Sequence, residues 1–213
     1  MAVQAALADP ARLRITDVLA DGDASPSELA AMLAMPSNLL AHHLRVLEDT
    51  AIVTRRRSQG DKRRTYLRLN PDALAPLSGL PPLTAQRVLF VCTANSARSH
   101  LAAALWRGAS GVPAASAGTH PAYEIDPGAI AAASRHHLPL PRLNPASISD
   151  VREAGDLVVT VCDLAHEELA EPAALHWSVP DPVPSGDPGT FDTVVTELAG
   201  RVRDLAPRLA PAS

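Results

Sequence analysis

Cysteine is scarce in this chain, with only Cys92 and Cys162 among 213 residues. Two cysteines cannot build the disulfide framework that stabilises small secreted domains, so that class of protein is excluded. In a reducing compartment, such a pair is more consistent with catalytic, redox-active or simply buried thiols than with a structural disulfide. Both thiols are therefore available for chemistry.

Long hydrophobic runs are also missing. No segment reaches the roughly 20 apolar residues needed to cross a membrane, and the N-terminal MAVQAALADPARLR lacks the charged start and cleavage site of a secretory signal. We therefore expect a cytoplasmic protein without a membrane partner. Aromatic residues make up only 3% of the chain, but 46% of its residues are hydrophobic, which is enough for a buried core.

Charge is distributed unevenly along the chain. The net charge of −4 divides into +1 for residues 1–80 and −5 for residues 81–213. Basic residues gather between positions 55 and 68, where Asp61 is the only acidic residue; they are Arg55, Arg56, Arg57, Lys62, Arg63, Arg64 and Arg68. Such a cluster suits a polyanionic partner.

Proline and glycine are densest at 76–82, PLSGLPP, where helical periodicity has stopped. A chain of this length is comfortable for two domains, so we place a linker at 76–85 between domains at 1–75 and 86–213. Before the linker, the pattern predicts three helices and then two strands around the turn SQGDKR, over 3–19, 27–33, 37–47, 52–56 and 65–69. This order is typical of a helix-turn-helix followed by a hairpin.

After the linker, strand-like and helix-like segments alternate. The pattern predicts strands at 87–91, 114–117, 157–161 and 175–177, and helices at 97–106, 127–135 and 191–209. Alternation at this spacing indicates βαβ units around a parallel sheet. We therefore expect an α/β domain with a four-stranded parallel sheet flanked by helices.

Residues 88–99, VLFVCTANSARS, place Cys92 directly after an apolar strand and Arg98 at the start of a helix. A loop of this kind aligns backbone N–H groups and the positive helix end toward one point, where an oxyanion can bind; the expected donors belong to Thr93, Ala94, Asn95, Ser96, Ala97 and Arg98. The same field favours a thiolate, so we expect Cys92 to be the nucleophile. Arg98 offers a planar fork that matches two oxyanion oxygens. The alternative is a buried structural cysteine at a strand end.

The full CTANSARS loop, with the later SAGTH segment and the Asp181-Pro182 pair, resembles the low-molecular-weight protein tyrosine phosphatase superfamily over nearly all of residues 86–211. That superfamily includes thioredoxin-coupled and thiol-coupled arsenate reductases. The resemblance implies that Ser99 donates its hydroxyl to the Cys92 thiolate, that Asn95 braces the loop, and that Asp181 protonates the leaving oxygen. Asp181 and Pro182 could instead only form a turn.

Phosphatases of this superfamily usually carry aromatic residues after the aspartate-proline pair, whereas this chain reads DPVPSGD. Only Tyr123, in the loop after SAGTH, could supply a stacking wall. A small inorganic oxyanion such as arsenate therefore suits the site better than phosphotyrosine, although a phosphatase stays possible.

The resemblance also places Cys162 at the first of two further cysteines used by thioredoxin-coupled reductases, but the second is missing and Ala97 replaces an extra loop cysteine often seen. Two routes remain for releasing arsenite: Cys162 attacks the Cys92 adduct, or an external thiol such as mycothiol or glutathione does so. A thioredoxin-type reductant is the further candidate, and we expect no bound cofactor. Cys162 could equally be an inert buried residue.

The N-terminal stretch from LADPARLRITDVL to RRRSQGDKRRTYLRL resembles the winged helix-turn-helix of ArsR/SmtB-family repressors over almost all of residues 2–70. The resemblance implies duplex DNA as a partner, with a homodimer formed through this domain. The expected DNA contacts are Ser37, Asn38, His42, His43 and Arg45 on the recognition helix, and Arg55, Arg56, Arg57, Lys62, Arg63 and Arg64 in the wing. A domain used only for dimerisation is the alternative.

No metal site is expected in this domain. DGDASPSEL occupies the segment where metal-sensing relatives carry a cysteine pair, and the adjacent His42 and His43 point in different directions on a helix.

Three classes of function remain open: an arsenate reductase with an attached DNA-binding domain, a transcription factor whose catalytic fold senses an oxyanion or redox state, and a phosphatase. The complete set of Cys92, Arg98, Ser99 and Asp181 favours the first.

Overall fold

The computed structural model describes residues 2–70, 73, 83–140 and 144–212. The chain separates into two compact units, Met1–Pro81 and Pro82–Ser213, each with its own hydrophobic core. The predicted linker at 76–85 needs a correction at its end, because Leu83–Ala85 forms strand β3 and pairs in parallel with β8, Leu209–Pro211. The remainder of that linker, 76–82, lies outside the described residues.

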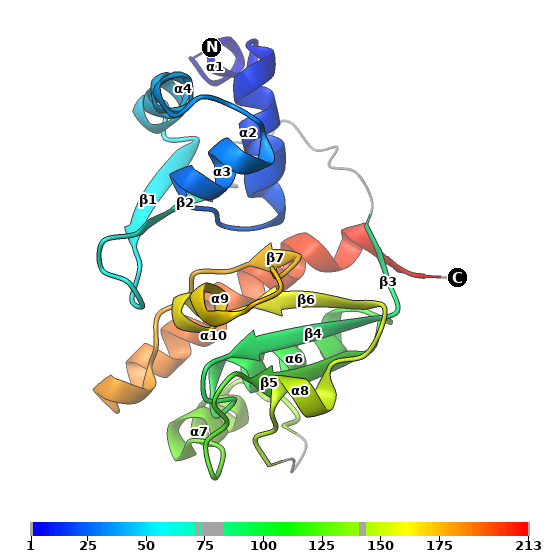
Figure 1. The fold of residues 1–213 in the computed structure, drawn as a ribbon. Helices are drawn as coiled ribbons and strands as arrows, with labels where there is room; N and C mark the ends of the chain where they lie inside the picture. The colour runs from blue at the N-terminus through cyan, green and yellow to red at the C-terminus, as the bar shows by residue number, and fades with distance from the viewer. Residues whose placement is uncertain (1, 71–72, 74–82, 141–143, 213) are drawn as a thin grey trace. The chain divides into compact units, whose positions relative to one another are not determined.

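The N-terminal unit is helical and ends in a hairpin (Figure 1). Its elements are α1 (Ala2–Leu7), α2 (Pro10–Asp21), α3 (Pro26–Met32), α4 (Ser37–Asp49), β1 (Val53–Arg57) and β2 (Thr65–Leu69). The single helix predicted over 3–19 is wrong, because α1 ends at Leu7 and a second helix, α2, begins at Pro10. The Asp9 side chain caps the new helix by accepting from the N–H groups of Ala11 and Arg12, and Pro10 fits the first helical position.

Capping and burial together shape the helix-turn-helix. Ser25 and Glu28 form a reciprocal capping box at the start of α3. Apolar residues from α2, α3 and α4, with Ile15, Leu29 and Leu44 at most 1% exposed, meet the hairpin in one core. The hairpin pairs antiparallel from Val53 with Leu69 to Arg57 with Thr65, which leaves its basic side chains mostly toward solvent.

The C-terminal unit contains the predicted four-stranded parallel sheet, in the order β5-β4-β6-β7. Its strands are β4 (Arg87–Cys92), β5 (Ala114–Gly118), β6 (Asp156–Thr160) and β7 (Leu175–His176). The helices are α6 (Arg98–Ala109), α7 (Pro127–Arg135), α8 (Ile148–Val151), α9 (Asp163–Glu168) and α10 (Pro188–Leu205), with short 3-10 turns at Val183–Ser185 and Ala206–Arg208. Helices α6 and α10 pack together on one face of the sheet, and α8 and α9 lie on the other (Figure 1).

The last helix differs in extent from the predicted 191–209. Helix α10 starts earlier, at Pro188, because the Asp187 side chain caps it by accepting from the Thr190 N–H. It ends at Leu205, and the chain then turns so that β8 can pair with β3. The two ends of this unit are thereby joined.

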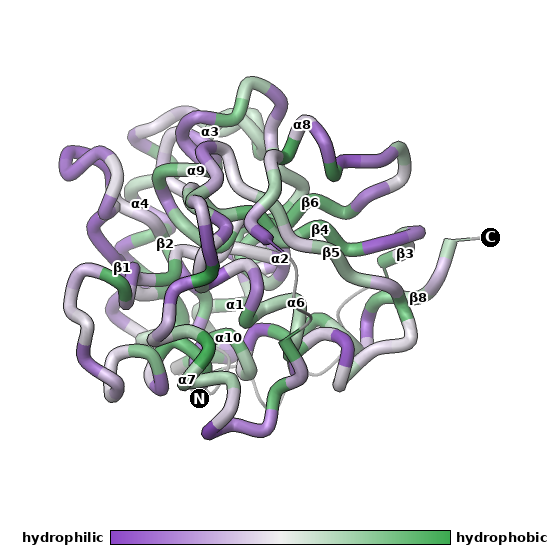
Figure 2. Tube along the Cα trace, turned by 90° about the horizontal axis from the view of Figure 1, so that it is seen from below, coloured by the Kyte–Doolittle hydropathy of each residue, from purple (hydrophilic) through white to green (hydrophobic). Residues whose placement is uncertain are grey.

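The central strand β4 is the hydrophobic axis of the unit, and Figure 2 colours it green. Five of its six residues are at most 2% exposed. The Phe90 ring lies 6.0 Å from Trp106 and 5.6 Å from Trp177, so three aromatic rings pack together and hold the strand in the core. Because the strand is rigid, its carboxyl end is a firm platform for a site. No helix of the described residues is long and apolar enough to cross a membrane.

Candidate active site

Cys92 is the last residue of β4, and the loop 93–97 carries the chain from it into α6. Its thiol is almost fully buried, at 2% exposure. Ala97, which precedes the helix, has no side chain able to cap it. The N–H groups at this helix end are therefore left for an anion.

The loop peptides are held with their carbonyl oxygens facing outward. Backbone N–H groups donate to the carbonyls of Cys92, Thr93, Ala94 and Ser96; the donors are Thr119 (3.1 Å), His120 (2.8 Å), Ala122 (2.8 Å) and Asp126 (2.9 Å). C=O and N–H point in opposite directions in a trans peptide, so the loop N–H groups face inward. Among the described residues, the N–H groups of Ala94, Ser96 and Ala97 have no protein acceptor. The segment 119–126 thus builds the predicted oxyanion pocket from outside, a role that the sequence did not reveal.

Asn95 occupies the centre of the loop in the left-handed conformation, with φ +48° and 1% exposure. Its N–H group lies 3.2 Å from Cys92 Sγ, and its side-chain oxygen accepts from the Ala146 N–H at 2.9 Å. Its Nδ2 donates to Ser99 Oγ at 2.8 Å, and Ser99 Oγ lies 3.1 Å from Cys92 Sγ. Since Ser99 already accepts from Asn95, its own hydrogen is available to the sulfur. This geometry suits the expected roles of Asn95 as a brace and of Ser99 as a donor to the thiolate.

Gly118, at the end of β5, lies directly against the loop. A Cβ added at this position would meet the Thr93 carbonyl oxygen at 2.6 Å. Backbone cannot retreat as a flexible side chain can, so only glycine allows this approach. The glycine of SAGTH is therefore a requirement of the pocket.

Arg98 reaches back over the pocket from the first turn of α6. Its guanidinium is 7% exposed; Nη1 donates to the Val179 carbonyl at 3.0 Å, and Nη2 pairs with Asp181 at 3.0 Å. The second Asp181 oxygen accepts from the Val183 N–H at 3.2 Å, which also makes it a turn residue. The fold thus brings Asp181 to the loop from far along the chain, and its side chain is 37% exposed at the rim.

Cys162 approaches the same loop from the neighbouring strand. It precedes α9, is 1% exposed, and its Sγ lies 3.3 Å from Thr93 Oγ1 and 3.4 Å from the Ala165 N–H. Burial raises the pKa of the Cys162 thiol, while the Arg98 charge opposes that rise. At neutral pH, Cys162 is therefore a protonated thiol beside the Cys92 loop.

A buried polar cluster, absent from the sequence predictions, fixes the helix that follows Cys162. Thr160 Oγ1 lies 2.9 Å from His176 Nδ1 and 3.2 Å from His166 Nδ1, and the two rings stack at 4.0 Å. His176 Nε2 is 3.3 Å from Asp163. The cluster joins β6, β7 and α9, so it restrains the position of α9. His176 lies on a separate strand, ten residues beyond His166, so the sequence alone does not show that it joins the other three.

The rim of the pocket carries little aromatic surface. Tyr123 is 96% exposed and is the only Phe, Tyr or Trp in segment 118–126, while the Asp181 loop carries Val183 in its short 3-10 turn. His120 and Thr119 both contact one oxygen of Glu168, at 3.2 Å each. The structure therefore shows no stacked aromatic walls in these two segments.

On the N-terminal unit, Ser37, Asn38, His42 and Arg45 of α4 are exposed, as a recognition helix requires. His43 differs: it is 6% exposed and its Nδ1 lies 3.9 Å from Asp9. Neighbouring residues on a helix face different directions, and His43 faces the core. The prediction of His43 as a DNA contact is corrected on that ground.

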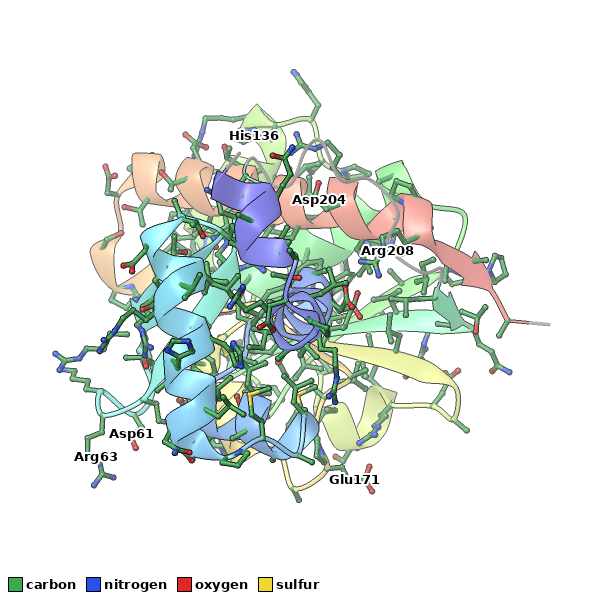
Figure 3. The ribbon with its side chains drawn as sticks, turned by 90° about the horizontal axis from the view of Figure 1, so that it is seen from above. Asp61, Arg63, His136, Glu171, Asp204 and Arg208 are labelled. Atoms are coloured by element: carbon green, nitrogen blue, oxygen red, sulfur yellow. The ribbon has the colours of Figure 1, made fainter. Side chains whose placement is uncertain are left out.

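The wing presents a basic surface that is partly neutralised by acidic neighbours. Five of its predicted contacts are exposed and Arg56 is half-buried; the exposed residues are Arg55, Arg57, Lys62, Arg63 and Arg64. Arg55 hydrogen-bonds Glu48, and Arg63 pairs with Asp61 at 3.1 Å near the outer end of the hairpin (Figure 3). The Arg63 guanidinium holds the pKa of Asp61 below its usual value. Arg57, Lys62 and Arg64 are exposed on the same surface.

Together, the parallel sheet and the loop from Cys92 into α6 define an α/β domain with a buried thiol at the carboxyl end of a central strand. The family model for low molecular weight phosphotyrosine protein phosphatases matches residues 87–212, and a helix-turn-helix domain model matches residues 7–56. The chain belongs to the low molecular weight phosphotyrosine protein phosphatase family and joins that domain to a helix-turn-helix domain. The predicted fusion is thereby confirmed.

Solved structures of similar fold each cover a little over half of this chain. An arsenate reductase from Archaeoglobus fulgidus is 30% identical, with 56% of this chain and 98% of that chain covered and a TM-score of 0.50. The tyrosine phosphatase Wzb from Escherichia coli K30, in complex with sulphate, is 22% identical, with 58% of this chain and 97% of that chain covered and a TM-score of 0.52. A YwlE mutant from Bacillus subtilis is 23% identical, with 58% of this chain and 97% of that chain covered and a TM-score of 0.51. A comparison with curated proteins finds no match. The family match makes the C-terminal unit an enzyme domain, and the two structures below 25% identity show its fold alone.

Proposed function

We propose that the C-terminal unit reduces arsenate to arsenite with thiol reductants, and that the N-terminal unit binds operator DNA in the manner of ArsR-type regulators. The observation that carries the first part is the second thiol, which lies 3.3 Å from Thr93 of the nucleophile loop. The absence of aromatic residues from the DPVPSGD segment supports a small oxyanion over phosphotyrosine. The 30% identity to an arsenate reductase agrees with this choice.

The first chemical step uses the residues already assembled around Cys92. The thiolate attacks arsenic, an S–As bond forms, and one As–OH bond breaks as its hydroxyl takes a proton from protonated Asp181 and leaves as water. Arg98 and the inward N–H groups hold the remaining oxygens, where charge develops. Ser99 donates to the sulfur and stabilises the thiolate before attack.

The second step is a thiol attack on the Cys92 sulfur. A disulfide forms, the S–As electron pair passes to arsenic, and arsenite leaves with two added electrons. The attacking thiol is either Cys162 or an external thiol of the mycothiol, glutathione or thioredoxin type. One further thiol reduces a mixed disulfide with the external thiol, whereas a Cys92–Cys162 disulfide takes two; in both cases Cys92 is restored and the external thiols leave as a disulfide. Because burial keeps Cys162 protonated, the Cys162 route requires its proton to be removed first.

The test measures arsenite release from the full chain with arsenate and each reductant in turn, beside hydrolysis of an aryl phosphate. We expect thiol-dependent arsenite that is lost in Cys92→Ser, since a neutral hydroxyl is a poor nucleophile. Vigorous aryl phosphate turnover without arsenite would instead establish a phosphatase. Cys162→Ser separates the two thiol routes: retained arsenite with an external thiol means that Cys162 is not the attacking group.

The regulatory part of the proposal rests on α4 and the wing. Small polar side chains at Ser37 and Asn38 suit base-edge contacts, and the exposed wing cations suit phosphate. A homodimer would present two such surfaces to a two-fold operator. Fluorescence anisotropy with duplex DNA at increasing salt tests the contact: affinity must fall steeply with salt. Replacing Arg57 and Arg64 by glutamine must weaken binding and reduce that slope, and light scattering reports the oligomeric state.

A further inference from the structure

The peptide between Asn95 and Ser96 differs from the other peptides of the Cys92 loop. The carbonyls on either side of it accept backbone N–H groups, but within the described part of the chain no backbone donor reaches the Asn95 carbonyl. In a trans peptide, the group that holds this carbonyl also sets the direction of the Ser96 N–H. A rotated peptide would point an oxygen at the anion instead of a donor. Control of this one peptide therefore matters for oxyanion binding.

His100 occupies the position from which this peptide can be held. It is the third residue of α6 and is 3% exposed, beneath the loop. Its Nδ1 lies 3.3 Å from Ser116 Oγ on β5, and the backbone of Asn95 acts to raise the pKa of its ring. Because the Ser116 hydroxyl is the partner of Nδ1, Nε2 is the ring nitrogen left to hydrogen-bond Asn95. Among the described residues, the buried Nε2 has no hydrogen-bond partner, so it is the ring nitrogen left to serve a neighbouring acceptor.

The protonation state of His100 gives this ring one suitable donor. Burial lowers the pKa of His100, although the Asn95 backbone favours the charged form, so the ring is neutral near pH 7. A neutral imidazole carries a single N–H. When the Ser116 hydroxyl donates to Nδ1, that N–H resides on Nε2, the buried nitrogen without a partner among the described residues.

We propose that His100 is a positioning residue of the oxyanion pocket, whose Nε2–H holds the Asn95 carbonyl outward and thereby directs the Ser96 N–H at the bound anion. An anion that accepts from Ser96 polarises the same peptide, so the His100 contact tightens on binding. The proposal rests on the oxyanion-binding role of the loop, which is part of the proposed function. It does not depend on arsenate being the substrate.

The test uses inorganic phosphate as the probe and the reduced full chain as the protein. Phosphate protection of Cys92 from iodoacetamide, quantified by mass spectrometry, gives the half-protecting concentration. His100→Leu removes the donor, and we expect that concentration to rise about 3- to 10-fold, as for loss of one hydrogen bond. His100→Gln places an amide nitrogen near the position of Nε2, so it must restore binding to within about twofold. The matched control is His136→Gln, an exposed histidine paired with Asp192 at 3.0 Å (Figure 3).

Each outcome separates the proposals. Absence of phosphate protection in the unmodified chain contradicts the oxyanion site itself, and with it the proposed function. Equal protection of the unmodified chain and His100→Leu overturns the role of His100 alone. If circular dichroism shows that His100→Leu does not fold, His100→Asn takes its place. Its shorter amide sits near the Nδ1 position and cannot serve Asn95, so protection by Asn equal to that by Gln also overturns the proposal.

Discussion

The pairing of Arg98 with Asp181 has opposite consequences for binding and for turnover. The guanidinium that must grip the oxyanion already binds a carboxylate at 3.0 Å. An incoming anion must compete with that carboxylate and is also repelled by it. In Asp181→Asn, the charge is removed at nearly constant size, so we expect inorganic phosphate to bind more tightly while turnover falls.

The magnitude follows from the exposure of the pair. Two unit charges about 4 Å apart interact by about 4 kcal/mol at an effective dielectric constant of about 20. Because 37% of the Asp181 side chain is exposed, water screens most of this interaction. We therefore expect removal of the Asp181 charge to favour phosphate binding by about 1 kcal/mol, which corresponds to about fivefold tighter phosphate inhibition. Loss of the general acid is expected to lower kcat by about 100-fold or more.

The assay is steady-state arsenite release with inorganic phosphate as competitor, and the control is Asp187→Asn. Asp187 lies six residues further on and caps α10, a role that asparagine fills equally well. The control must leave both the inhibition constant and kcat close to those of the unmodified chain. Weaker phosphate inhibition in Asp181→Asn, or an unchanged kcat, would refute the reasoning.

Three further predictions concern the supports of the site. Gly118→Ala, whose Cβ would lie 2.6 Å from a loop carbonyl, must weaken phosphate protection by about tenfold or more, whereas Gly111→Ala, with open space around it, must not. Arg87→Met leaves the carboxylate of Asp156, 2% exposed, without its ion-pair partner, so urea denaturation should show a loss of about 3 kcal/mol. The Cys162 thiol has a raised pKa in the folded chain, so its alkylation below pH 8 must be slower than in urea. The same shift stabilises the folded state at lower pH, and that contribution is lost as pH rises past the pKa of a free thiol.

Much of the fold was predictable because its strands carry strong local patterns. The run VLFV at 88–91 is buried on both sides, as a central parallel strand requires, and Cys92 follows at the carboxyl end of the strand. The break at Asp9-Pro10 was also readable, since aspartate caps helices and proline begins them. The pairing of β3 with β8 was not, because three-residue segments at opposite ends of a domain show no periodicity.

The site divides in the same way. Cys92, Arg98 and Ser99 are close in sequence, and the loop's resemblance to a known family drew attention to Asp181. The outward carbonyls of the loop depend on partners at 119–126, and the position of His100 depends on Ser116, so neither follows from local sequence. His43 shows the limit within one helix, because a shift of one residue separates an exposed side chain from a buried one.

The most direct test of the central claim is a single-turnover experiment on the reduced full chain with arsenate and one external thiol. Arsenite is counted, and the state of each cysteine is read by mass spectrometry after acid quenching. The account predicts one arsenite per Cys92 oxidised to a disulfide, whether with Cys162 or with the external thiol. Arsenite formation with Cys92 still reduced and unmodified, or aryl phosphate turnover with no arsenite, would contradict it.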